Sequence, residues 1–99
     1  MAIEITDFRT HKKNTLRGFI TVRLTTIGLE IRDLAVHEKN GGRWLQLPAK
    51  PYEKPDGSKG WNYIINFYEK KNYRQFQEMA LKALDLFQRE AKRIGDEKR

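Results

Sequence analysis

Apolar and polar residues alternate along five stretches of the chain, and alternation with a period of two is typical of half-buried strands. We expect strands over residues 3–8, 17–26, 29–38, 43–47 and 61–68. In the second of these, Ile20, Val22 and Leu24 share one face and predict the side that packs on a core. The short spacing between the first four favours an antiparallel arrangement of neighbours along the chain.

The alternation changes phase inside the third stretch. By strict counting, Leu29 and Ile31 lie on one face, and Leu34 and Val36 lie on the other. One extra residue resets the pleat of a strand. We therefore predict a bulge at residues 32–33, which returns all four side chains to the core side.

Tight turns and breaks separate the later stretches. Asn40-Gly41-Gly42 supplies residues that tolerate the positive φ angles of a hairpin turn. Leu-Pro-Ala-Lys-Pro at 47–51 predicts a corner, since proline has no N–H for a ladder. The composition of residues 52–60 predicts a loop.

From residue 73 the apolar spacing changes to three and four, which predicts an amphipathic helix. Asn72 followed by Gln75 resembles a capping box, and Gly95 suits the end of the helix, which leaves residues 96–99 as a frayed tail. Leu81 and Leu86 widen the apolar arc and are available to seat a second subunit. The core-facing stripe consists of Phe76, Ala80, Ala83, Leu84, Phe87, Ala91 and Ile94.

These elements predict one α+β domain over residues 1–95. We expect a four- to five-stranded antiparallel sheet with one long C-terminal helix packed on a face of it. A length of 99 residues suits a single domain of this kind.

Charge and composition narrow the function. Twenty basic and thirteen acidic residues give a net charge of +7, which favours polyanionic partners. The chain has no cysteine, so we expect no disulfides. It also has no long apolar run, so we expect no membrane partner. We therefore expect a cytoplasmic or nucleoid-associated protein. His11 and His37 lack metal-site spacing, and nucleotide and hydrolase motifs are missing, so we expect no enzyme, metal, cofactor or small-molecule substrate.

Basic and aromatic residues gather on one strand and around the expected loop, which favours phosphate neutralisation combined with base stacking. An ordinary solvated sheet face explains the same pattern. For Trp44 and Trp61, a place in the core or in a dimer interface is favoured over a role as base platforms, and all three roles stay open. The candidate nucleic-acid-binding residues are Arg17, Phe19, Arg23, Arg43, Trp44, Lys50, Tyr52, Lys54 and Lys59.

Several short motifs follow one another in a recognisable order. They are Ile3 to Arg9, Asp33-Leu34, Asn40-Gly41, Leu47-Pro48-Ala49-Lys50 and Asp56-Gly57, followed by a C-terminal helix. In this order the chain resembles the stage V sporulation protein G (SpoVG) family over roughly residues 3 to 90. The resemblance implies a small bacterial regulator that binds nucleic acid and forms a homodimer by strand pairing.

The sequence therefore predicts a non-enzymatic DNA- or RNA-binding regulator. Two alternatives stay open. One is a single-strand-binding protein like the positive-cofactor-four group, which also combines a basic sheet with a helix. The other is a protein-interaction or structural module whose charge serves solubility alone.

Overall fold

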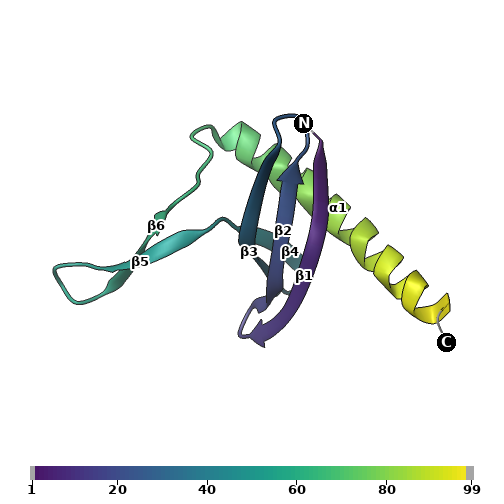
Figure 1. Ribbon diagram of the computed structural model, residues 1–99. Helices are drawn as coiled ribbons and strands as arrows, with labels where there is room; N and C mark the ends of the chain where they lie inside the picture. Colours follow the sequence, from purple (N-terminus) through teal and green to yellow (C-terminus); the bar gives the residue numbers. More distant parts are fainter. Residues whose placement is uncertain (1, 98–99) are drawn as a thin grey trace.

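The computed structural model describes the backbone of residues 2–97 and the side chains of residues 2–93. The chain is α+β, with a four-stranded antiparallel sheet, a second two-stranded sheet and one long C-terminal helix (Figure 1). The molecule is elongated, with extents of 55 × 32 × 23 Å. The two-stranded sheet projects from one side of the main sheet, and the C-terminal end of the helix projects from the other (Figure 1).

The main sheet has the strand order β1-β2-β3-β4, with each neighbouring pair antiparallel. The first four predicted strands are confirmed within a few residues, except that the first, which we expected over residues 3–8, extends to Lys13. It extends because β2 pairs with it as far as Lys13, and Asn14 adopts a positive φ of 55° in the turn. The strands are β1 (Ile3–Lys13), β2 (Leu16–Leu24), β3 (Leu29–Lys39), β4 (Gly42–Gln46), β5 (Ala49–Glu53) and β6 (Lys59–Tyr63).

The predicted bulge in the third strand is confirmed. Ile20 pairs with Leu34 and Val22 pairs with Ile31, so β3 carries one residue more than β2 between these pairs. Asp33 takes up the extra length at a φ of 62°, a conformation that aspartate tolerates better than most residues do. Ile31 and Leu34 are both buried as a result.

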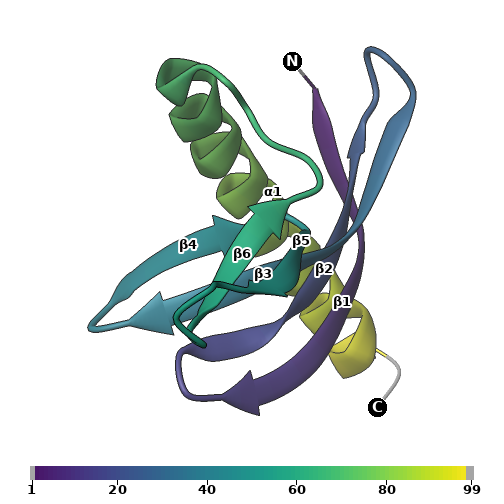
Figure 2. The ribbon, with the colours of Figure 1, turned by 90° about the vertical axis from the view of Figure 1, so that its left-hand side faces the viewer.

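The last strand is a correction to the predicted single sheet. Residues 61–68 were expected to join the other strands, but β6 ends at Tyr63 and pairs only with β5, a strand that the sequence did not predict. The expected loop at 52–60 is a hairpin, closed where the amides of Lys54 and Gly57 donate to the carbonyls of Ser58 and Lys54. We call residues 49–63 the arm. It stands in front of β3 and β4 when the molecule is seen from the arm side (Figure 2).

The helix α1 (Lys70–Glu97) packs against β1 and β4 and closes the core. Phe76, Ala80 and Leu84 are buried as the stripe predicted, but Ala91 is exposed because the last turns extend beyond the sheet. Of the two outlying leucines, Leu81 packs at the edge of the core and Leu86 is 60% exposed. The Ile94 side chain lies outside the described residues.

Both predicted helix ends differ from the structure. The helix begins at Lys70, one turn before the expected start near Tyr73, because the Tyr73 amide already donates to the Glu69 carbonyl at 3.2 Å. It also continues through Gly95 to Glu97, so Gly95 does not end it. Of the expected frayed tail, residues 98–99 lie outside the described part of the chain.

A side-chain amide joins the helix to the edge strand β4. The Leu45 amide donates to Gln77 Oε1 at 2.8 Å, and Gln77 Nε2 donates to the Leu45 carbonyl at 2.7 Å. The Tyr73 hydroxyl donates to the same carbonyl at 3.1 Å. Gln77 thus makes the two bonds that another strand would make, and it blocks this edge of the sheet at Leu45.

Candidate nucleic-acid interface

The helix leaves one face of the main sheet uncovered, and we call it the open face. A groove lies between this face and the base of the arm. Its volume is about 450 Å³. Aromatic and aliphatic side chains predominate in its lining, and Asp33, His37 and Gln46 supply the polar groups. The remaining lining residues are Leu16, Phe19, Ala35, Leu47, Pro48, Ala49, Trp61 and Ile64.

His37 organises the polar side of this groove. One ring nitrogen lies 3.0 Å from Thr15 Oγ1, and the other lies 3.1 Å from Gln46 Oε1. The ring stacks on Trp44 with 5.3 Å between centroids and 8° between planes. A bond at each nitrogen and a stacked neighbour fix the plane of the imidazole, so Trp44 and Gln46 hold defined positions beside the groove.

Phe19 lies on the same face, as the sequence predicted, and two side chains of β1 flank its ring. The Arg9 guanidinium carbon lies 5.8 Å from the ring centroid, and the His11 ring lies 6.0 Å from it. The phenyl group is therefore half-buried, with Arg9 and His11 beside the ring, and it also lines the groove.

Arg17 and Arg43 do not share this face, which corrects the predicted site. A second bulge lies at Arg17, since Leu16 pairs with His37 while Gly18 already pairs with Val36. The bulge turns Arg17 to the helix side of the sheet, where its Nε lies 3.9 Å from the Glu38 carboxylate. Arg43 lies on that side too and forms an ion pair with Asp85 of the helix at 2.9 Å.

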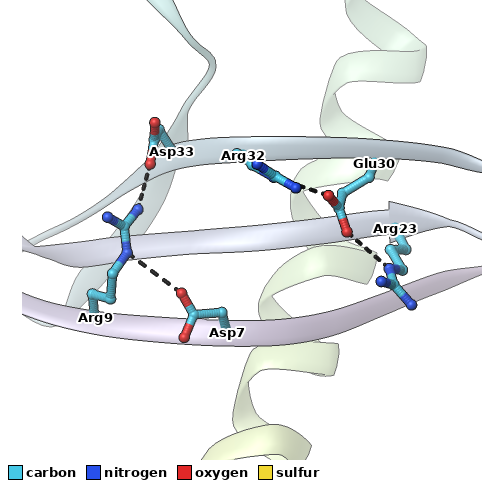
Figure 3. A network of polar contacts seen from close by, with 6 residues as sticks. All are labelled: Asp7, Arg9, Arg23, Glu30, Arg32 and Asp33. Carbon is cyan, nitrogen blue, oxygen red and sulfur yellow. Dashed lines mark hydrogen bonds and ion pairs between the residues drawn. The ribbon is translucent and has the colours of Figure 1, made fainter.

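Arg23 does lie on the open face, but it belongs to a network of ion pairs there (Figure 3). Glu30 accepts from Arg23 at 3.0 Å and from Arg32 at 2.9 Å, and these bonds lower the pKa of its carboxyl group. Arg9 bridges two further carboxylates on the same face, those of Asp7 and Asp33, in a separate group of ion pairs. Three arginines thus balance three acids, and this part of the face carries no net charge.

The other predicted residues lie on the arm. Lys50, Lys54 and Lys59 are exposed, and none forms an ion pair within the described residues. Tyr52 covers the glycine opposite to it: a Cβ at Gly60 would lie only 2.5 Å from the tyrosine Cζ. Its ring therefore supports the hairpin and remains 40% exposed.

Arginines and lysines therefore divide by role over residues 2–63. Each of the five arginines of β1–β4 forms an ion pair, whereas no lysine of the described segment does. The hairpins β1–β2 and β3–β4 turn at the same end of the sheet, where the Glu38 amide donates to the Thr15 carbonyl. The six lysines lie at these two turns and on the arm: Lys12, Lys13, Lys39, Lys50, Lys54 and Lys59.

Two side chains that sequence reasoning did not select complete the groove. The sequence around His37 has no signal for a place in a groove, and its position opposite Leu16 depends on the bulge at Arg17. Trp61 was noted beside the loop, but only the folding of the arm brings it to the groove, where it is 57% exposed. The signal available in the sequence was the occurrence of aromatic residues next to lysines. It indicated the segment around the loop, but not which side chains of the main sheet lie opposite to it in the groove.

The described part of the chain shows no cluster of three or more metal-ligating side chains. Nor does any described helix combine the length and hydropathy needed to cross a membrane. The sequence matches no known family model and no curated protein.

Proposed function

We propose that this protein binds nucleic acid without catalysing a reaction on it, and that lysines at the hairpin turns and on the arm neutralise the phosphates. One observation carries the proposal, namely the division between paired arginines and unpaired lysines over residues 2–63. A cation that is already paired gains little from a phosphate. A solvated lysine gains the entropy of the counterions that its phosphate releases.

Exposed aromatic rings next to these lysines give a second reason. Trp61 and Tyr52 lie on the arm, and Trp44 lies beside the groove; their side chains are 57%, 40% and 41% exposed. Large aromatic groups left in solvent mark binding surfaces, and ring faces next to ammonium groups suit bases joined by phosphates. The resemblance of the motif order to that of the SpoVG family supports the same function, in a cytoplasmic regulator that contacts DNA or RNA.

We also propose that the chain pairs with a second copy. An isolated two-stranded hairpin is marginally stable in water, and both edges of the arm are unpaired within the described structure. The β4 edge is blocked by Gln77, which leaves β1 and the arm as the edges available for strand pairing. Sedimentation velocity that shows only a monomer at high protein concentration would contradict this pairing.

The binding proposal is tested by removing three positive charges from two places. We compare the variant Lys50→Gln/Lys54→Gln/Lys59→Gln with Lys82→Gln/Arg89→Gln/Lys92→Gln, which removes the same charge from exposed helix positions. In fluorescence anisotropy with labelled oligonucleotides, we expect the arm variant to reduce the slope of log K against log salt by about 2, at roughly 0.7 per lost contact with a single strand. The helix variant should keep most of the slope.

Equal losses in both variants would show that net charge alone attracts the nucleic acid. No binding by the wild-type protein at low salt would favour the protein-interaction module instead.

A further inference from the structure

The groove beside the arm is suited to a different part of a nucleic acid from the phosphates. Its lining is mostly apolar, with Phe19 from the main sheet and Trp61 from the arm as its aromatic members. The one carboxylate in it, that of Asp33, is paired with Arg9. Its volume of about 450 Å³ lies within the range of small-ligand pockets, which is roughly 300–1,000 Å³.

Resting on the proposed function, we propose that this groove takes unpaired bases, so that the protein prefers single-stranded DNA or RNA to a duplex. A phosphate gains nothing from apolar walls, whereas an unpaired base has free ring faces that stack on aromatic side chains. In a duplex those faces are covered by neighbouring base pairs and cannot enter such a groove.

The polar side of the groove offers a hydrogen-bond donor for such a base. The Gln46 side-chain oxygen is occupied by His37, while its amide nitrogen has no partner among the described residues. A free amide N–H group can donate to the carbonyl or ring-nitrogen acceptors that every base displays. The site therefore favours bases in general and does not select one of them.

The charges around the groove fit the backbone of the same strand. Lys50 follows Ala49 in β5, and Lys59 lies two residues before Trp61 in β6, so unpaired ammonium groups stand on both strands that reach the groove. The neighbouring open face is neutralised by its own acids, so it offers no broad positive surface for a duplex. The arm carries three lysines against two acids, Glu53 and Asp56, and its lysines are spread along a narrow hairpin, a shape that follows one strand.

The test compares Trp61→Ala with Tyr68→Ala, a control that removes a 94% exposed aromatic group from outside this groove. Each protein is titrated with labelled single-stranded oligothymidylate, oligouridylate and a DNA duplex, and thermal unfolding checks that the variants fold. We expect Trp61→Ala to weaken single-strand binding roughly 5- to 140-fold and to change duplex binding little. Tyr68→Ala should leave both unchanged.

A backbone without bases provides a second, independent readout. An oligonucleotide of abasic sites has the phosphates of oligothymidylate but nothing to fill the groove, so it should bind wild type about as weakly as oligothymidylate binds Trp61→Ala. Equally tight binding of the abasic strand would overturn the base site while leaving the phosphate contacts in place.

Other outcomes separate this inference from the function on which it rests. Salt-sensitive binding with equal affinity for single strands and duplex would refute the groove assignment and leave the nucleic-acid proposal standing. Loss of self-association in Trp61→Ala with unchanged single-strand affinity would show that a second copy fills the groove, which also refutes it. Failure of wild type to bind any of the probes would refute both.

Discussion

The side chain of Gln77 provides the most specific test of how the helix holds the strand that leads to the arm. Replacement by alanine removes the hydrogen bond from the Leu45 amide and the bond to the Leu45 carbonyl. The carbonyl keeps its bond from Tyr73, but the half-enclosed amide loses its acceptor. Two lost bonds of about 1 kcal/mol each predict a reduction of about 2 kcal/mol in the free energy of unfolding.

For a domain of this size, 1 kcal/mol shifts the melting temperature by roughly 4–8 °C. We therefore expect Gln77→Ala to melt about 8–16 °C below wild type, followed by circular dichroism. Gln75→Ala is the matched control, because this glutamine is exposed on the same helix. The control should change the free energy of unfolding by less than about 0.5 kcal/mol, as is usual for surface positions.

The variant Gln77→Glu sharpens the test. A carboxylate accepts from the Leu45 amide but repels the carbonyl to which the glutamine amide donates. We expect this variant to be destabilised at neutral pH and to recover part of the loss when acid protonates the carboxyl group and restores a donor. If Gln77→Ala melted like the Gln75→Ala control, the bridge to the edge strand would have no energetic significance and the reasoning would be wrong.

Two further predictions concern the sheet and the helix. Gly18→Ala should lower the free energy of unfolding, measured in urea, by about 2 kcal/mol, because the new Cβ would lie 2.5 Å from the Arg9 carbonyl oxygen and the backbone cannot move aside. In Gly60→Ala the new Cβ meets only the Tyr52 side chain, so the loss of stability should be clearly smaller. Equal losses in the two variants would contradict this account. Burial, with the nearby Tyr63 as a smaller cause, raises the pKa of the Tyr73 hydroxyl above 10.0. The contribution of Tyr73 to stability is therefore complete below pH 10 and is lost as the pH rises through the raised folded-state pKa. Spectrophotometric titration and unfolding of Tyr73→Phe check this, since the variant should lack the alkaline loss; identical alkaline profiles would refute it.

Sequence patterns predicted the elements whose signal is local. The bulge at residues 32–33 was visible because four apolar side chains changed phase around it. The helix stripe was visible because Phe76, Ala80 and Leu84 recur at spacings that only a helix places on one face. In both cases, burial of apolar side chains fixes the geometry, and the pattern records that burial.

The second bulge had no such signal. The long side chain of an arginine can reach solvent from either face of the sheet. Moving Arg17 to the helix side therefore leaves the alternation of apolar residues unchanged. Of the three predicted cations on the main sheet, Arg17 and Arg43 lie on the helix side and Arg23 lies on the open face. Which acid pairs with which arginine depends on strand register, and Arg43 finds Asp85 forty-two residues away.

The arm was missed for a related reason. Residues 49–53 contain a proline and bury almost nothing, so they carry no alternation to reveal a strand. Proline is tolerated there because alternate residues of an edge strand need no partner for their N–H groups. The Asp56-Gly57 turn was evident, but whether Trp61 joins the main sheet or a separate hairpin is decided by pairing at long range.

The most direct measurement of the central claim is the salt dependence of oligonucleotide binding by the wild-type protein. Fluorescence anisotropy of a labelled single strand, repeated over a series of potassium chloride concentrations, gives the slope of log K against log salt. If all six lysines at the turns and on the arm contact phosphates, the slope is about −4, from roughly 0.7 per contact. Absence of binding at low salt, or a slope near zero, would contradict the assignment of these lysines to a nucleic acid.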